Sequence, residues 1–163
     1  MNRRYVHAFV MAAVLGVSGA SVRAQTGVVP PPYAEYRLDA IQGRGTAVHA
    51  GAGLTIPAGT YVRVAAIGAI GPRWDHGETT LSGRTDLIAR FLFDPLRQTP
   101  VALSLGGGVS VPYETGERVR PYLTAVIDVE GRQRSGLAPA LQVGLGGGVR
   151  VGVVLRTTQL RRR

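Results

Sequence analysis

From Tyr33 almost to the end of the chain, hydrophobic and polar positions alternate with a period of two, and no window shows the period of 3.6 that marks a helix. This alternation is typical of β-strands, whose successive side chains point to opposite faces of a sheet. Segments rich in turn-forming residues divide the pattern into eight runs. We therefore predict strands over residues 33–42, 46–56, 60–70, 80–93, 101–113, 118–130, 137–145 and 149–158.

The segments between these strands are rich in Gly, Pro, Asp and Glu. The longest, Gly71–Thr79, is predicted to be a loop. Two Gly triplets occur in similar surroundings, Gly106–Gly108 and Gly146–Gly148. We predict the first as strand interior and the second as a hairpin. An unbroken strand over residues 137–158 would be about 70 Å long at about 3.3 Å per residue, far more than a bilayer needs.

The charged residues of the predicted strands all fall on one of the two faces. In the strand over residues 80–93, Arg84, Asp86 and Arg90 alternate with Leu87 and Phe91. Much of the remaining polar row is Gly, Ala or Ser, and such small residues leave room for bulky Arg side chains inside a narrow tube. The opposite row consists mainly of Val, Leu and Ala.

A sheet with one charged and one apolar face can close in two ways, as a soluble barrel or sandwich with its apolar face inward or as a barrel in lipid with that face outward. The small residues of the polar row, its interleaved charges and the strand lengths favour lipid. We predict a single antiparallel up-and-down β-barrel of about eight strands with its apolar face outward. Its lumen would hold an ion-pair network of Glu35, Arg37, Asp39, Arg63, Arg84, Asp86, Arg90, Arg120, Asp128, Glu130, Arg150 and Arg156.

The first residues are typical of an exported protein. Arg3 and Arg4 precede the apolar segment Ala8–Val17, which is too short to span a bilayer as a helix, and residues 22–24 fit a cleavage site. An N-terminal membrane anchor is the alternative. We predict a signal peptide over residues 1–24, a Pro-rich lead-in over 25–32, the barrel over 33–158 and a basic tail over 159–163.

Composition narrows the possible functions. The chain has 163 residues, 45% of them hydrophobic, which suits one domain. It contains no Cys and no Lys, which excludes disulfides, thiolate chemistry and Schiff-base or Walker-type lysines. The net charge of +9 falls to +6 without the predicted signal peptide. Because acids oppose many of the remaining Arg residues, we expect no nucleic-acid partner, but contact with anionic lipid or polysaccharide.

The signal peptide, the alternation and the turn spacing make residues 33–158 resemble the small outer-membrane β-barrel proteins of the OmpA and OmpX type. The resemblance implies an eight-stranded barrel in the outer membrane of a Gram-negative-type bacterium, in contact with outer-membrane lipid. We expect a monomer whose loops can meet lipopolysaccharide or a surface partner. These proteins usually end on a strand with a terminal aromatic residue, whereas this chain ends in Arg161–Arg163.

Candidate residues for chemistry are few. His76 lies close to Asp75 and Glu78, and these three side chains together could ligate a metal ion. The same segment also reads as a polar, Gly-bent loop at the water interface, and no second His or Cys cluster supports a metal centre. The Gly triplets lack the following helix and Lys of a phosphate-binding loop. We therefore predict no cofactor, no metal and no enzymatic activity.

An eight-stranded barrel is just wide enough to be filled by its own side chains, so no open pore is expected. The predicted role is structural or an envelope-interaction role. Two alternatives stay open. One is a soluble periplasmic barrel that binds a small apolar ligand. The other is an outer-membrane lipid hydrolase, whose candidate residues would be Ser104, Ser110 and His49.

Overall fold

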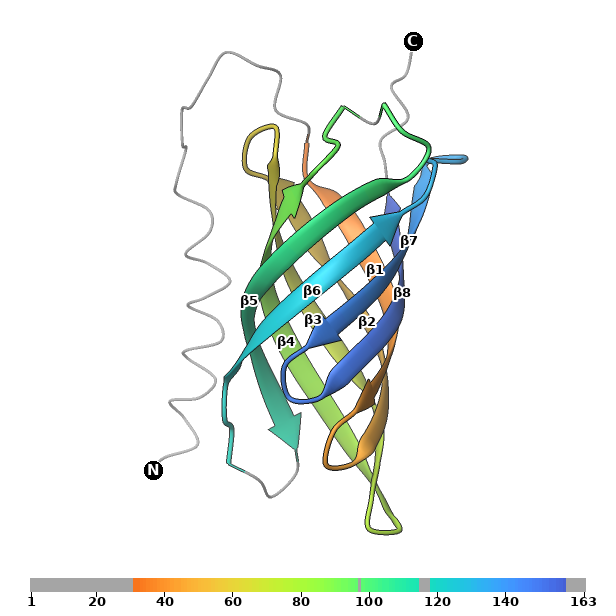
Figure 1. Ribbon diagram of the computed structural model, residues 1–163. Helices are drawn as coiled ribbons and strands as arrows, with labels where there is room; N and C mark the ends of the chain where they lie inside the picture. Colours follow the sequence, from red (N-terminus) through yellow and green to blue (C-terminus); the bar gives the residue numbers. More distant parts are fainter. Residues whose placement is uncertain (1–30, 97, 115–117, 158–163) are drawn as a thin grey trace.

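The structure, a computed structural model, describes residues 31–157 except residue 97 and residues 115–117. The predicted signal peptide, most of the lead-in and the basic tail lie outside the described residues. Strands adjacent in sequence pair antiparallel, and β1 pairs with β8, so the sheet closes into an up-and-down barrel (Figure 1). Its strands are β1 (Tyr33–Gln42), β2 (Thr46–Pro57), β3 (Val62–Asp75), β4 (Glu78–Leu92), β5 (Ala102–Glu114), β6 (Tyr122–Glu130), β7 (Leu137–Leu145) and β8 (Val149–Thr157).

The two ends of the barrel differ. At the terminal end, β1 begins and β8 ends. The connections over residues 58–61, 93–101 and 131–136 are also at this end. At the turn end, which points down in Figure 1, lie the connections over residues 43–45, 76–77 and 146–148 and the described part of the β5–β6 connection, residues 118–121. The described residues include no helix long and apolar enough to cross a membrane.

The predicted strand pattern is confirmed, with identical bounds for β1 and β7. The two Gly triplets also behave as predicted: Gly106–Gly108 lies inside β5, and Gly146–Gly148 joins β7 to β8. All three glycines of the second triplet have positive φ angles, 131°, 68° and 144°. This left-handed conformation is readily available only to glycine, which is why the second triplet turns.

The predicted loop over Gly71–Thr79 is wrong. β3 continues to Asp75, and a two-residue turn of His76 and Gly77 leads directly into β4. Both turn residues have positive φ, 47° and 85°, as in a type I′ hairpin. Gly71 is needed for a close approach of strands and not for a turn, because a Cβ there would lie 1.9 Å from the carbonyl oxygen of Val48.

The predicted strand over residues 118–130 begins too early. β6 starts at Tyr122, where its pairing with β5 ends at Ser110, and residues 118–121 belong to the connection between the two strands. Pro121 stands directly before β6 and has no N–H to donate to a ladder. Arg118 and Arg120 therefore lie in an exposed connection outside the sheet.

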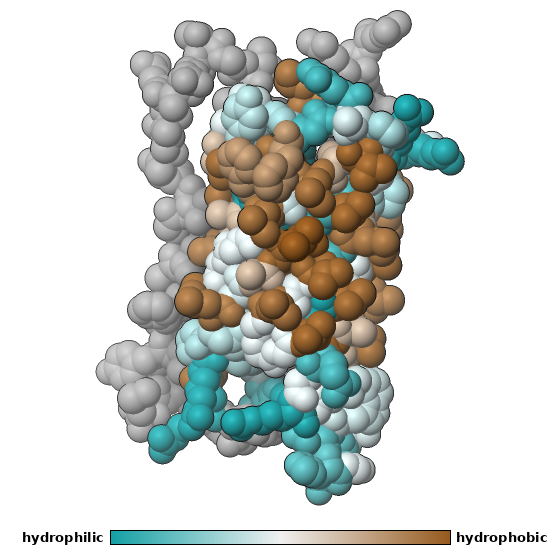
Figure 2. Space-filling model, viewed as in Figure 1, coloured by the Kyte–Doolittle hydropathy of each residue, from teal (hydrophilic) through white to brown (hydrophobic). Residues whose placement is uncertain are grey.

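The two faces of the sheet have opposite chemistry. The outward positions of the eight strands carry no charged residue among those described, and many hold exposed large apolar side chains, such as Leu141 at 59% exposure. Figure 2 shows these side chains as an apolar belt between hydrophilic ends. The inward positions hold the buried charged residues, including Glu35, Asp128 and Arg156. The barrel is therefore apolar outside and charged inside.

Glycines on the inward row make room for these charged side chains, as the small residues in the sequence predict. A Cβ on Gly152 would lie 2.0 Å from Oδ1 of Asp39 and 2.9 Å from the carbonyl oxygen of Leu38. A Cβ on Gly106 would lie 2.9 Å from Cγ of Arg90. The charged side chains of the interior can therefore pack only because these inward positions are glycine.

Replacing Gly152 by Ala should destabilise the barrel by about 1–3 kcal/mol, because the added methyl group displaces Asp39 or the β1 backbone. The matched control is Gly68→Ala on the outward face of β3, where a Cβ meets nothing within 4 Å. The control should change stability by less than about 0.5 kcal/mol. Urea unfolding of the refolded protein in detergent measures both, and equal losses would contradict the packing argument.

Candidate functional site

The candidate site is the lumen, in which the structure collects predicted network residues from five of the eight strands, β1, β3, β4, β6 and β8. All of them except Arg120 line the lumen or its mouths, and most are almost fully buried. Their side chains form two groups around carboxylates. The Glu35 cluster lies toward the terminal end and the Asp86 cluster toward the turn end.

Glu35 is the centre of the first cluster. Its carboxylate accepts two parallel hydrogen bonds from Arg90, at 2.8 and 2.9 Å, and one from Nε of Arg156 at 3.1 Å. Thr55 donates a further hydrogen bond at 3.1 Å. The side chain of Glu35 is fully buried, so these donors replace the water that an exposed carboxylate would bind.

Arg156 extends this cluster to β6. Its two terminal nitrogens donate to Glu130 and Asp128, each at 2.6 Å. Asp128 also accepts a hydrogen bond from Gln142 at 2.6 Å and lies 2.9 Å from Nε of Arg90. Arg63, partly exposed at the terminal mouth, pairs with Glu130 at 3.2 Å. One guanidinium thus holds carboxylates of both β1 and β6.

Asp86 is the centre of the second cluster. It accepts hydrogen bonds from Arg150 at 2.8 Å, from Nε of Arg84 at 3.1 Å and from the hydroxyl of Ser110 at 2.5 Å. Arg84 also donates to Asp39. The cluster crosses the lumen, since its members come from β1, β4, β5 and β8.

Arg37 joins the two clusters. One terminal nitrogen donates to Glu35 at 3.0 Å and the other to Asp86 at 3.1 Å. The charged groups therefore form one continuous network along the lumen. Its cations and anions alternate, so each buried charge has an opposite charge beside it.

Uncharged polar residues complete the network and were missing from the prediction. Thr55, Ser104, Ser110 and Gln142 are buried and donate to the carboxylates. Their signal in the sequence was present, because each stands on the polar row of its strand. An inventory of charged residues alone leaves these donors out.

The prediction for Arg120 is wrong. Its side chain is exposed in the connection before β6, and it has no ion pair or hydrogen bond with any described residue. The alternation of polar and apolar residues continues through residues 118–121, but the sheet does not. Assigning faces from this alternation therefore placed Arg120 on a sheet face that does not exist there.

His49 and Ser82 form a pair that resembles half of a catalytic triad. Nε2 of His49 lies 2.7 Å from Oγ of Ser82, and a terminal nitrogen of Arg84 lies 3.1 Å from Nδ1. A guanidinium can only donate, so Nδ1 accepts and the proton of the neutral ring sits on Nε2. In this tautomer His49 donates to Ser82 and cannot act as its general base.

The other candidates for chemistry lie apart from such an arrangement. Ser104 and Ser110, the predicted hydrolase candidates, donate to Asp128 and Asp86. His76 lies 3.6 Å from Asp75, whose carboxylate also pairs with Arg73. Within the described residues, no group of three His, Cys, Asp or Glu side chains is placed to hold a metal ion.

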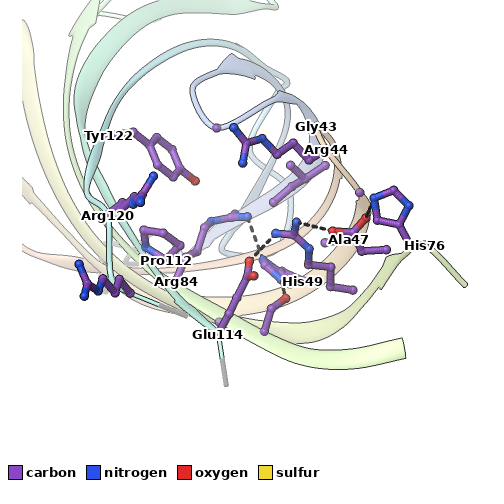
Figure 3. A pocket seen from close by; sticks show the side chains of 18 residues that line it. Gly43, Arg44, Ala47, His49, His76, Arg84, Pro112, Glu114, Arg120 and Tyr122 are labelled. Carbon is purple, nitrogen blue, oxygen red and sulfur yellow. Dashed lines mark hydrogen bonds and ion pairs between the residues drawn. The ribbon is translucent and has the colours of Figure 1, made fainter. Parts of the chain in front are cut away.

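A cavity of about 790 Å³ opens at the turn end, directly above the Asp86 cluster. Figure 3 shows side chains around this opening, with His49 and Arg84 at its base and Arg44 and Tyr122 nearer the rim. We call this cavity the vestibule. A smaller cavity of about 130 Å³ lies at the terminal end beside Glu130.

No protein-family model and no curated protein sequence matches the chain. Two solved structures of designed proteins are similar in fold. One, described as "De novo design of transmembrane beta-barrels", is 15% identical with a TM-score of 0.45, covering 78% of this chain and 97% of that one. The other, "Solution NMR structure of de novo designed TMB2.3", is 14% identical with a TM-score of 0.49, covering 80% and 97%. Such similarity says nothing about function.

Replacing Arg156 by Leu should destabilise the barrel by about 3–5 kcal/mol, because it removes the buried cation that Glu35, Asp128 and Glu130 share and leaves their negative charges undercompensated. The same substitution at exposed Arg120 should change stability by no more than about 0.5 kcal/mol. Urea unfolding in detergent measures both variants. The network would lose its structural importance if Arg156→Leu proved no more damaging than Arg120→Leu.

Proposed function

We propose that this chain is an integral outer-membrane β-barrel, closed to diffusion and without catalysis, with a structural or envelope-interaction role. The observation that carries the proposal is the distribution of charge: an uncharged apolar exterior around a charged interior. In water, an exposed apolar belt around the whole barrel would far exceed the few hundred Å² usual on soluble monomers. Against acyl chains, the same exterior is the favourable one.

The dimensions of the belt support this proposal. On β3, the outward row from Val64 to Trp74 covers about ten residue steps. At about 3.3 Å per residue and a tilt of about 40°, these steps span about 25 Å, the height of a typical apolar band. Trp74 lies at the turn-end rim. Tyr61 stacks on Phe91 at the terminal rim, with ring centroids 5.8 Å apart.

Closure of the sheet also supports a membrane environment. The β1–β8 ladder leaves no free strand edge around the barrel, so backbone N–H and C=O groups are bonded between strands. In hydrocarbon, where no water can bond to them, only helices and closed barrels meet this requirement.

The charged lumen favours this proposal over its two rivals. A soluble barrel that binds an apolar ligand needs an apolar interior, whereas this lumen is crossed by guanidinium and carboxylate groups. A lipid hydrolase needs an activated nucleophile, whereas His49 donates to Ser82 in the tautomer that Arg84 imposes. We further propose that the protein is a monomer in contact with outer-membrane lipid, without a nucleic-acid partner.

Replacing Leu141 by Arg should destabilise the barrel by about 2–4 kcal/mol, because this outward residue lies midway along β7 and would place a charge in hydrocarbon. The matched control is Leu96→Arg in the connection over residues 93–101, also exposed, which should cost less than about 0.5 kcal/mol. Urea unfolding in lipid vesicles measures both. A soluble protein that tolerates both substitutions without detergent would overturn the membrane proposal.

Purified protein in planar bilayers should show no stable porin-sized conductance, because the network of Arg and acidic side chains fills the lumen. Heat-modifiable mobility on gels provides the control that the barrel is folded. Reproducible large steps from the folded form would contradict the closed lumen, and they would leave the membrane location intact.

A further inference from the structure

The vestibule at the turn end is lined by an excess of cationic groups. Its base is formed by Arg84 of the Asp86 cluster, by His49, which contacts Arg84, and by Ser82, which contacts His49. Its walls come from the three short turns, from the ends of β3 to β5 and from the connection before β6. The wall cations are Arg44, Arg73, Arg118 and Arg120, and the wall acids are Asp75 and Glu114.

Both wall acids are already occupied. Arg73 donates one hydrogen bond to Glu114 and another to Asp75, the latter at 3.2 Å. By contrast, Arg44, Arg118 and Arg120 are exposed, and none has an ion pair or hydrogen bond within the described part of the chain. Counted over the described residues, the opening therefore presents three unpartnered guanidinium groups, while both of its carboxylates pair with Arg73.

We propose that the vestibule binds a phosphate-bearing ligand. Guanidinium groups bind phosphate oxygens through paired hydrogen bonds, and Arg is the side chain best suited to this geometry. Tyr122 lines the same opening and offers a phenolic O–H as a further donor (Figure 3). A cavity of about 790 Å³ is large enough for a phosphorylated headgroup or saccharide.

The opposite mouth lacks this combination. The cavity there measures about 130 Å³ and is lined by Glu130 as well as Arg132. Arg132 and Arg134 are exposed in the connection between β6 and β7, so they supply matched charges at the wrong end of the barrel. The two mouths can therefore be compared directly.

The test is an NMR titration of the full chain, refolded in a zwitterionic detergent, with inorganic phosphate. Saturable shifts should appear at turn-end residues. The double variant Arg44→Gln/Arg120→Gln should weaken binding about tenfold or more, as expected for lost charge-assisted hydrogen bonds. The control Arg132→Gln/Arg134→Gln, which removes the same charge from the terminal end, should change affinity by less than about twofold because distant surface charges are screened.

A third variant tests the role of the wall acids. Glu114→Gln removes a negative charge and releases Arg73, so it should tighten phosphate binding. Heat-modifiable mobility confirms that each variant is folded, and all four substituted Arg residues lie in exposed connections. Absence of saturable shifts, or equal weakening by the two double variants, would overturn the proposal.

A second arm identifies the source of the phosphate, and it alone rests on the membrane proposal. The titration is repeated in lipid nanodiscs with and without phosphatidic acid. If the phosphomonoester headgroup reaches the vestibule, it should suppress the response to added phosphate, and an unchanged response assigns the site to a soluble ligand. Failure to insert into nanodiscs would overturn the membrane proposal. The detergent titration would still decide whether the vestibule binds phosphate.

Discussion

The pairing of buried charges in the lumen is the constraint on which the rest of this structure depends. An isolated charge removed from water costs several kcal/mol, so each guanidinium inside the barrel needs a carboxylate beside it. Glu35 and Asp86 meet this need by each accepting from several Arg side chains. Those bulky side chains fit only where facing positions are small, which explains the glycines on the inward row. With the charged row paired inside, the apolar row faces outward.

The interior and the two mouths of the barrel use the same residue type in opposite ways. Inside, Arg side chains are paired with carboxylates across the lumen, which supports the proposed closed barrel. At the turn end, Arg44, Arg118 and Arg120 have no such partner among the residues that the structure describes. Under the two proposals above, the same side-chain type closes the tube in one place and binds an anion in another, and the difference lies in whether a carboxylate stands opposite.

The sequence predicts most of this fold because the period of two is a local property and turn residues interrupt it. It fails where local pattern and long-range pairing disagree. Gly71 resembles a turn residue but permits close approach to Val48, and residues 118–121 continue the alternation after the ladder has ended. For the site, the alternation along each strand identifies which side chains face inward. The partner of each side chain depends on the stagger between strands far apart in sequence, so the bridge made by Arg37 could not be inferred.

The contact between Glu35 and Arg156 lies at the seam where the first strand meets the last, and the two residues are direct cross-strand neighbours. During folding, Glu35 on the first strand gains Arg156 as a partner only when the last strand pairs with the first. Without the last strand, Glu35 would keep Arg90 and Arg37 but lose the guanidinium that links it to Asp128 and Glu130. Closing the seam therefore adds the shared cation of three carboxylates and completes a row of backbone hydrogen bonds in the same step.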